Sequence, residues 1–401
     1  MANSLSKPWL TIIGIGEDGL SGLSDASRNA LEKAEIVFGG ERHLKLARID
    51  GRGKTWPVPF DAACVLARRG RPTAVLASGD PFWHGAGGGL AAQLSRDEWI
   101  AYPAPSTFSL AASRLGWRIE EVSCIGLHAA PFERLVPLLA RGVRIICLVR
   151  DGIAASELAR WLSQRGFAAS RLWTMSALGG PHERVLESRA DGYGLEGIES
   201  PLALAIEADG AAGLSRASGL VDDLFRHDGQ ITKRPVRALA MSALAPRAGE
   251  RLWDIGAGSG SISVEWALAG GTAVAVEARE ERATNIRANA AAFGLVHKIT
   301  VIVGSAPAAL GGLDGPHAVF IGGGLDAAMC AALWPLLPDG SRLVTHSVTL
   351  ETEALLSELQ RRHGGDLMRI EIAHAAPLGR MRSWDTARPI VQWNAVKGGA
   401  A

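Results

Sequence analysis

The sequence predicts an α/β protein built from two different folded units, and three observations support this fold class. Short β-branched runs alternate with alanine-rich helical stretches along the chain. Two glycine-rich loops, at residues 14–19 and 256–260, each follow a short apolar run. The chain turns rich in glycine, serine and aspartate near its middle, where we expect a linker. We therefore expect domains over residues 1–210 and 230–401, joined by a linker over 211–229.

The first half contains apolar runs and helical stretches that alternate less regularly than those of the second half. We expect strands over residues 9–13, 73–77, 143–149 and 201–207. We expect helices over residues 25–34, 106–115, 132–140 and 154–164. A break near residues 101–105 predicts that this half is divided into two lobes.

The second half begins with a helix over residues 233–244 and then alternates strands and helices. The expected strands cover residues 251–255, 272–276, 300–303, 318–321 and 342–348, and the helices cover 261–269, 280–292 and 326–336. Two final strands, over 367–372 and 390–396, are separated by a turn-prone stretch. This order fits a doubly wound sheet that is closed by an antiparallel hairpin.

Composition excludes several classes of protein. The hydrophobic fraction of 47% predicts a globular chain, and no apolar run reaches the length of a membrane span. The net charge of +1 and the dispersed basic residues weigh against a large nucleic-acid interface. Residues 1–8 are polar and lack the apolar core of a signal peptide, so we expect a cytoplasmic protein.

The four cysteines stand far apart, at Cys64, Cys124, Cys147 and Cys330. We interpret them as buried thiols, with no disulfide framework and no zinc site. The ten histidines form no cluster, so we expect no catalytic metal.

The second glycine loop has a spacing that favours a nucleoside cofactor over a dinucleotide. Its glycines are Gly256, Gly258 and Gly260, with Ala257 and Ser259 between them, whereas a dinucleotide fingerprint needs its third glycine one residue later. Glu277 ends the next expected strand, where a carboxylate can accept hydrogen bonds from both ribose hydroxyls, and Asp254 precedes the loop, near where a cationic group of the ligand would lie. These features predict S-adenosylmethionine, while a nucleotide-binding turn of another class remains the alternative.

The next strand ends extend this site. Gly304, Ser305 and Ala306 end the third strand of the second half, where an adenine would rest. Gly322 and Gly323 end the fourth strand, and their lack of side chains would let a bulky planar substrate approach, although a plain tight turn would also explain them.

The first glycine loop matches a dinucleotide fingerprint in spacing but not in context. Gly14, Gly16 and Gly19 satisfy G-x-G-x-x-G, yet residues 20–24 intervene before helical residues begin. The following apolar run also ends in two glycines, not in an acid. A nicotinamide dinucleotide is therefore only the second choice for this loop.

Two later segments complete the expected site of the first half. Gly79 and Asp80 form a sharp turn after an apolar strand, which would place a carboxylate and the following aromatic residues against a ligand. Ser106 and Thr107 open a helix, where their hydroxyls can contact a ligand. For Ser106 a plain N-cap role carries comparable weight.

These segments together resemble known families. Residues 10–19, 78–85 (SGDPFWHG) and 105–107 resemble the tetrapyrrole methylase superfamily. The motifs ITKRP (231–235), DIGAGSG (254–260), AVEAREER (275–282), GSAP (304–307) and VFIGGG (319–324) resemble the decarboxylating precorrin methyltransferase domain. In this order they resemble the bifunctional precorrin-6Y methyltransferases of aerobic cobalamin biosynthesis, over about residues 9–397.

The resemblance implies a two-lobed tetrapyrrole methylase fold followed by a class I, Rossmann-like methyltransferase fold. It implies one S-adenosylmethionine per domain, with Thr232 among the cofactor contacts. The N-terminal domain would methylate meso position 5 of a reduced precorrin-6. The C-terminal domain would methylate position 15 and decarboxylate the ring C acetate, giving precorrin-8. A homo-oligomer formed through the C-terminal domain is also implied.

Two other functions remain open at this point. Both implied folds also occur in RNA methyltransferases, although the near-neutral charge weighs against RNA. A protein that only binds its ligand is less consistent with two loops that both keep their glycines and acidic residues.

The expected chemistry needs no protein nucleophile, because a meso carbon of a reduced tetrapyrrole is itself enamine-like. His346 and Glu351 bracket the end of the fifth strand, where His346 could deliver a proton. A satisfied core or capping role is at least as consistent with the sequence.

A tetrapyrrole substrate with many carboxylates should be bound by clustered cations. Arg380 and Arg382 are the best candidates, although a solvated face explains any single cation better. The remaining candidates are two basic groups, Lys233 with Arg234 and Arg237, and Arg42 with His43 and Lys45.

Overall fold

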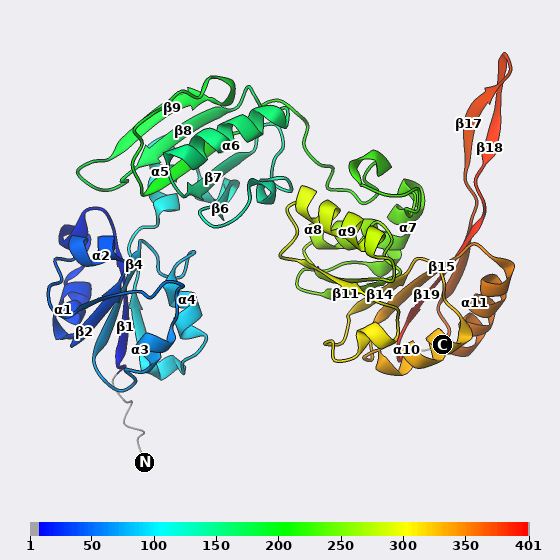
Figure 1. The fold of residues 1–401 in the computed structure, drawn as a ribbon, viewed down its shortest axis with the longest axis horizontal. Helices are drawn as coiled ribbons and strands as arrows, with labels where there is room; N and C mark the ends of the chain where they lie inside the picture. The colour runs from blue at the N-terminus through cyan, green and yellow to red at the C-terminus, as the bar shows by residue number, and fades with distance from the viewer. Residues whose placement is uncertain (1–7, 400–401) are drawn as a thin grey trace. The chain divides into compact units, whose positions relative to one another are not determined.

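The computed structural model describes residues 8–399, and the chain divides into two compact units. One unit comprises the chain up to Phe132 together with Leu138–Ala212, and the other comprises Glu133–Pro137 and the chain from Gly213 onwards. Figure 1 shows two sheets in the first unit and one large sheet in the second. Residues 1–7, part of the segment in which we expect no signal peptide, lie outside the described residues.

The first unit begins with a parallel sheet of order β3-β2-β4-β1-β5. Its inner strand β1 buries apolar side chains on both faces. Ile13 and Ile15 pack with α1 and α2, whereas Leu10 and Ile12 pack with α3 and α4. The strands are β1 (Leu10–Ile15), β2 (Ile36–Gly39), β3 (Gly53–Thr55), β4 (Thr73–Ser78) and β5 (Trp99–Tyr102), and the helices are α1 (Asp25–Lys33), α2 (Glu41–Leu46), α3 (Ala63–Leu66) and α4 (Ala86–Ala91).

The second sheet of this unit has the order β6-β7-β10-β8-β9 and is antiparallel except for the β6–β7 pair. Its strands are β6 (Val122–Gly126), β7 (Arg144–Val149), β8 (Arg171–Ser176), β9 (Arg184–Arg189) and β10 (Leu202–Glu207), with helices α5 (Thr107–Leu115) and α6 (Gly152–Gln164). The first sheet ends at Tyr102 and the second begins at Val122, which confirms the predicted division into two lobes.

The predicted helix over residues 132–140 is wrong. The structure has a short 3-10 turn, Phe132–Leu135, and no helix over the remaining residues of that range. Pro137 explains the difference, because proline lacks the N–H that an α-helix needs and its ring clashes with the preceding turn.

The second unit contains a seven-stranded sheet of order β13-β12-β11-β14-β15-β19-β16. The first five strands in this order are parallel, while β19 runs antiparallel to both β15 and β16. The strands are β11 (Arg251–Ile255), β12 (Thr272–Glu277), β13 (Ile299–Val303), β14 (Ala318–Ile321), β15 (Arg342–Ser347), β16 (Asp366–Ile370) and β19 (Ile390–Val396). The predicted doubly wound sheet with an antiparallel final pair is confirmed.

Helices cover both faces of this sheet because adjacent strand residues point to opposite sides. Leu252 packs in one core with residues of α7, α8 and α9, and Trp253 packs in another with α10 and α11. The helices are α7 (Arg234–Leu244), α8 (Ser261–Leu268), α9 (Glu280–Ala292), α10 (Ala327–Leu333) and α11 (Leu350–His363). Helix α11 was not expected from the sequence.

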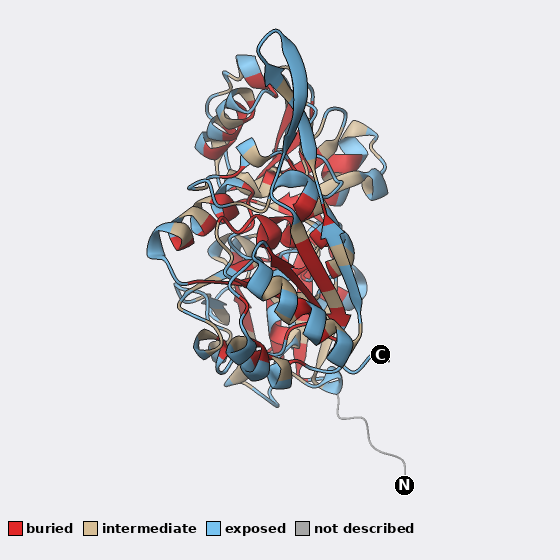
Figure 2. Cartoon of the chain, turned by 90° about the vertical axis from the view of Figure 1, so that its right-hand side faces the viewer, coloured by how far each residue is buried: buried red, intermediate tan, exposed pale blue. Residues whose placement is uncertain are grey.

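A two-stranded hairpin, β17 (Ala373–Leu378) and β18 (Met381–Thr386), occupies the stretch that was predicted to be only turn-prone. It projects from the sheet in Figure 1, and its pale blue colour in Figure 2 contrasts with the buried central strands. The hairpin leaves from the end of β16 and returns at the start of β19. It therefore starts at the same sheet edge as the carboxyl end of β15.

Candidate functional site

Three segments of the first unit meet at the carboxyl end of β1. Gly79, which follows β4, donates its N–H to the carbonyl of Ile15 at 3.1 Å, and its own carbonyl accepts from the N–H of Ala104 at 3.1 Å. A Cβ on Gly14 would lie 1.9 Å from the Gly79 carbonyl oxygen, so the backbones can approach this closely only at a glycine. The first glycine loop, the turn at Gly79 and the start of α5 are thus brought together.

Five of the six predicted ligand contacts of the first unit, all except Gly14, line one or both of two cavities that share lining residues. Asp80, Ser106 and Thr107 line a cavity of about 580 Å³. Gly16, Gly79 and Thr107 line a smaller one of about 40 Å³. This clustering from separate segments is what a ligand site at these strand ends requires.

Ser106 and Asp80 also hold the local backbone. Ser106 caps α5, because its hydroxyl accepts from the N–H of Ser109 at 3.0 Å. Asp80 accepts from the N–H of Phe82 at 2.9 Å, which forms the turn after β4. The capping role that the sequence left open for Ser106 is therefore present, and the residue lines the larger cavity as well.

His43 lines the larger cavity without carrying a charge at neutral pH. Burial first, and then the Arg42 charge, lowers the pKa of His43 to about 4. Its Nε2 lies 2.8 Å from the Ser78 hydroxyl and 2.9 Å from the Arg42 guanidinium, which also pairs with Glu17. Lys45 of the same predicted cluster is 74% exposed. Arg42, whose side chain is 36% exposed, is therefore the more shielded of the two cations that are charged at neutral pH.

The second glycine loop follows β11, where the order of the sheet reverses between β11 and β14. In an open α/β sheet such a switch point is the usual place for a ligand. Gly256, Gly258 and Gly260 have φ values of +66°, +59° and +71°, a backbone region that favours glycine. Ala257 and the largely buried Ser259 lie between them. The glycines therefore shape the loop itself.

Glu277 stands beside this loop at the end of β12. Its carboxylate accepts from the N–H of Gly258 at 2.9 Å and from the N–H of Arg279 at 3.0 Å, and the residue is 5% exposed. A carboxylate has about four acceptor positions, so two remain for hydroxyl groups. The position fits the predicted ribose contact.

Asp254, the other predicted acid, is buried at 1% exposure on β11. It accepts from the N–H of Ser263 at 3.1 Å and from the Ser263 hydroxyl at 2.6 Å, which ties β11 to the first turn of α8. Burial is the main reason why the pKa of Asp254 is raised to about 6.

The neighbouring strand ends lie around the same loop. Gly304 donates to the carbonyl of Glu277 at 3.0 Å, and Ser305 and Ala306 follow it. A Cβ on Gly256 would lie 3.7 Å from the Gly323 carbonyl, and a Cβ on Gly322 would lie 3.8 Å from the Gly256 carbonyl. Thr232, just before α7, is half-buried.

The remaining candidates are dispersed. His346 is 4% exposed on β15, and its Nε2 lies 2.9 Å from the Gln392 carboxamide oxygen. It is therefore a buried, hydrogen-bonded core residue, which is the alternative that the sequence left open. Glu351 is exposed in the first turn of α11. Arg380 and Arg382 lie on the exposed hairpin, which projects from the sheet of the second unit (Figure 1).

The expectation that Arg237 faces a ligand together with Lys233 and Arg234 is wrong. The Arg237 side chain is fully buried and forms an ion pair with Glu265 at 2.6 Å. This pair was not expected from the sequence. A signal was present, because Glu265 is the single charged residue of helix α8, and a charged residue that is buried needs a partner.

Within residues 8–399 no group of three His, Cys, Asp or Glu side chains is placed to hold a metal ion. The cysteines are unpaired. Cys147 and Cys330 are buried, whereas Cys64 and Cys124 are half-buried, so the prediction of four buried thiols is wrong for two of them. No described helix is both long and apolar enough to cross a bilayer.

The second unit has a doubly wound sheet with a glycine loop and a strand-end carboxylate. The first unit has two sheets and its own strand-end glycines. Together these features define a two-domain α/β methyltransferase. Residues 9–192 match the family model of tetrapyrrole (corrin/porphyrin) methylases, and residues 223–397 match the precorrin methyltransferase domain. The chain belongs to the family of decarboxylating precorrin-6Y C(5,15)-methyltransferases, as its full-length relatives show.

One such relative, a precorrin-6Y C(5,15)-methyltransferase from Sinorhizobium sp, is 48% identical over 98% of both chains. Another of the same name, from Mycobacterium tuberculosis, is 37% identical over 97% of this chain and 100% of its own. The crystal structure of the C-terminal domain of precorrin-6Y C5,15-methyltransferase from Rhodobacter capsulatus is 54% identical, covers 46% of this chain and 100% of that one, and has a TM-score of 0.45.

Proposed function

We propose that this enzyme uses S-adenosylmethionine to methylate a reduced precorrin-6 at meso positions 5 and 15. It also decarboxylates the ring C acetate to give precorrin-8 in aerobic cobalamin biosynthesis. The observation that carries the proposal is the presence in one chain of two separate strand-end sites, each inside the range of its own methyltransferase family model. The names of the full-length relatives support a tetrapyrrole substrate over RNA.

The two sites divide the work in this proposal. The N-terminal domain, residues 1–210, methylates position 5, and the C-terminal domain, residues 230–401, methylates position 15 and promotes the decarboxylation. Each domain binds one S-adenosylmethionine, which supplies an electrophilic methyl group. The protein's contribution is to position the reacting carbon and exclude water.

In the first domain the larger cavity suits a planar, acidic ligand. Trp56, Phe60 and Trp83 line it and offer aromatic faces to a macrocycle, while Arg150 contributes a cation at its wall. The hydroxyls of Ser106 and Thr107 and the loop at Gly79 lie at the same strand ends, where we propose the cofactor binds.

In the second domain Glu277 is the central cofactor residue of the proposal. Its carboxylate would accept the ribose hydroxyls, with Gly304, Ser305 and Ala306 beside the adenine and the glycine loop beneath the nucleoside. Thr232 and Asp254 complete the proposed contacts. The substrate would lie over Gly322 and Gly323, which present backbone without side chains.

We also propose a cytoplasmic homo-oligomer that forms through the hairpin of the second domain. Leu378, Met381 and Trp384 are 65%, 76% and 72% exposed on that hairpin, and a second copy would bury them. The hairpin begins at the same sheet edge as the candidate site. In an oligomer its Arg380 and Arg382 could therefore bind the substrate carboxylates of a neighbouring copy.

Calorimetric titration of the full chain with S-adenosylhomocysteine tests the cofactor count. We expect two sites in the wild type, one in Glu277→Ala and one in Gly79→Ala, whose added Cβ would lie 2.8 Å from the Pro105 carbonyl oxygen. Incubation with a reduced precorrin-6 and at least two equivalents of S-adenosylmethionine should then yield a product that has gained two methyl groups and lost one carboxyl group as carbon dioxide, as measured by mass spectrometry. A single site in the wild type would refute the two-site proposal.

A further inference from the structure

A segment with little regular structure, residues 219–232, precedes α7 and is held to the second unit by buried polar side chains. We call it the strap. Its regular structure is a single 3-10 turn, Asp222–Leu224, so backbone hydrogen bonds within the strap do little to fix its path. Side chains from three helices supply the contacts instead.

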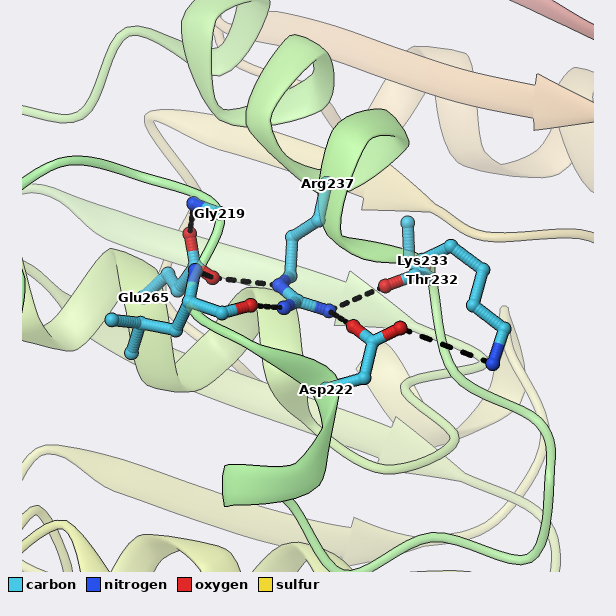
Figure 3. Close-up of polar contacts among 7 residues, drawn as sticks. Gly219, Asp222, Thr232, Lys233, Arg237 and Glu265 are labelled. Atoms are coloured by element: carbon cyan, nitrogen blue, oxygen red, sulfur yellow. Dashed lines mark hydrogen bonds and ion pairs between the residues drawn. The ribbon is translucent and has the colours of Figure 1, made fainter. Parts of the chain in front are cut away.

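Arg237 of α7 fastens both ends of the strap (Figure 3). Its guanidinium donates to the carbonyl of Leu220 and to the carbonyl of Thr232 and pairs with Asp222 at 3.1 Å. Its Nε bonds Glu265, whose two carboxylate oxygens accept from the N–H groups of Gly219 at 2.8 Å and Leu220 at 2.9 Å. The Arg237 side chain is fully buried, and its partner Glu265 is 3% exposed, so this ion pair is shielded from water.

Asn289 of α9 fastens the middle of the strap and also touches the glycine loop. Its Oδ1 accepts from the N–H of Arg226 at 2.8 Å, and its Nδ2 donates to the Arg226 carbonyl at 2.9 Å. The same Nδ2 donates to the carbonyl of Ser259 at 2.8 Å. The residue is 2% exposed, so one buried amide joins the strap to the loop after β11.

The strap also approaches the loop near its far end. A Cβ on Gly258 would lie 3.6 Å from the Gln230 carbonyl. The neighbouring Asp228 accepts from Arg282 of α9 at 2.8 Å. The strap therefore runs beside the glycine loop from Arg226 to Gln230.

The composition of this network suggests a geometric role. A buried ion pair is costly to desolvate, and well-packed apolar residues of similar volume often stabilise a protein equally well. The hydrogen bonds of the Arg237 guanidinium and the Asn289 amide are directional, so each donor fixes the position of one backbone carbonyl. Arg237 also lies over the Phe225 ring at 4.8 Å, which fixes the apolar side of the strap.

We propose that Arg237 and Asn289 are positioning residues for S-adenosylmethionine in the second domain. They hold the strap against the glycine loop so that it forms one wall of the cofactor site, with Thr232 at its end. This inference rests on the proposed function of that domain. Neither side chain touches the ligand, and both act through the strap backbone.

The test compares two conservative variants with a matched control. Arg237→Lys keeps the charge but loses the fork, and Asn289→Asp keeps the shape but loses both donated bonds. The control is Arg342→Lys. Arg342 begins β15 and pairs with Glu250, which precedes β11, and the two side chains are 13% and 14% exposed. This partly buried pair lies at the end of β11 that is away from the glycine loop. Each variant is made in the full chain.

The readouts are the dissociation constant for S-adenosylhomocysteine by calorimetry, below the unfolding temperature of every variant, and hydrogen exchange of the strap amides. At the site that is lost in Glu277→Ala, we expect the dissociation constant to rise at least tenfold in Arg237→Lys and in Asn289→Asp. The strap should exchange faster in both. The other site should be unchanged, and Arg342→Lys should bind normally at both sites even if its unfolding temperature falls.

Two results would overturn the inference, and they can be told apart. In the first result, the wild type binds S-adenosylhomocysteine at the second-domain site, and both strap variants have dissociation constants within twofold of the wild-type value although their strap amides exchange faster. The strap is then no part of the site. If the wild type has no site that Glu277→Ala removes, the proposed function of the second domain fails and the inference fails with it.

Discussion

Asp254→Asn should stabilise the enzyme at neutral pH while weakening its affinity for S-adenosylmethionine. The carboxylate is buried and accepts two hydrogen bonds from Ser263, both of which an asparagine carbonyl can also accept. The substitution therefore removes a buried charge and keeps the link between β11 and α8.

The magnitude follows from the pKa of Asp254, which rises from 3.8 to about 6 in the folded protein. Between these values the folded state binds more protons than the unfolded state, so the contribution of this group to stability falls as the pH rises. Above pH 6 the carboxylate is charged in both the folded and the unfolded state, and burying this charge lowers the free energy of unfolding by about 3 kcal/mol. The variant should lack this dependence. The free energy of unfolding of the variant should thus exceed that of the wild type by an amount that grows between pH 4 and pH 6, to at most about 3 kcal/mol.

Urea unfolding from pH 4 to pH 8 measures this difference directly. Calorimetry should show a larger loss of affinity for S-adenosylmethionine than for S-adenosylhomocysteine, because only the former carries the sulfonium charge. A variant that is less stable than wild type at pH 7.5 and keeps the wild-type pH dependence would refute the reasoning. Equal loss of affinity for both ligands would show that the cationic group beside Asp254 is not the sulfonium.

Three further predictions concern other parts of the chain. Gly14→Ala should abolish cofactor binding in the first domain, because its Cβ would overlap the Gly79 carbonyl; calorimetry checks this, and the second site serves as the internal control. Replacing Leu378, Met381 and Trp384 of the hairpin by serine should lower the mass measured by light scattering to that of one chain. An unchanged mass would exclude the hairpin as the interface. Gln392→Leu should leave the His346 imidazole without its partner and lower the free energy of unfolding by about 1–3 kcal/mol. Chemical denaturation measures that change, and a neutral effect would argue against the core role.

The strand-end motifs could be predicted because their requirements are local. A strand that ends in glycine and turns sharply needs particular residues at particular positions, so Gly14, Gly79 and Gly256 are recognisable in the sequence. The doubly wound order of the second half was predictable for a similar reason, since buried parallel strands form short apolar runs between helical stretches.

Other elements were missed or wrong because their signals are weak or depend on distant partners. The β17–β18 hairpin is exposed along its length, so its residues do not alternate between buried apolar and exposed polar types. Neither the burial of Arg237 nor the link from Asn289 to Ser259 can be inferred from spacing, because each partner lies on a different element.

By itself the sequence determined the two-unit α/β organisation, the family and the two glycine loops, since local backbone geometry and strand burial restrict which residues can occur there. Only the tertiary structure decided which charged side chains remain available. Arg237 looks like a ligand contact in the sequence, yet the fold buries it against Glu265. The physical reason is that the low polarity of the interior makes a charge depend on its partners in space, and those partners come from segments that only folding brings together.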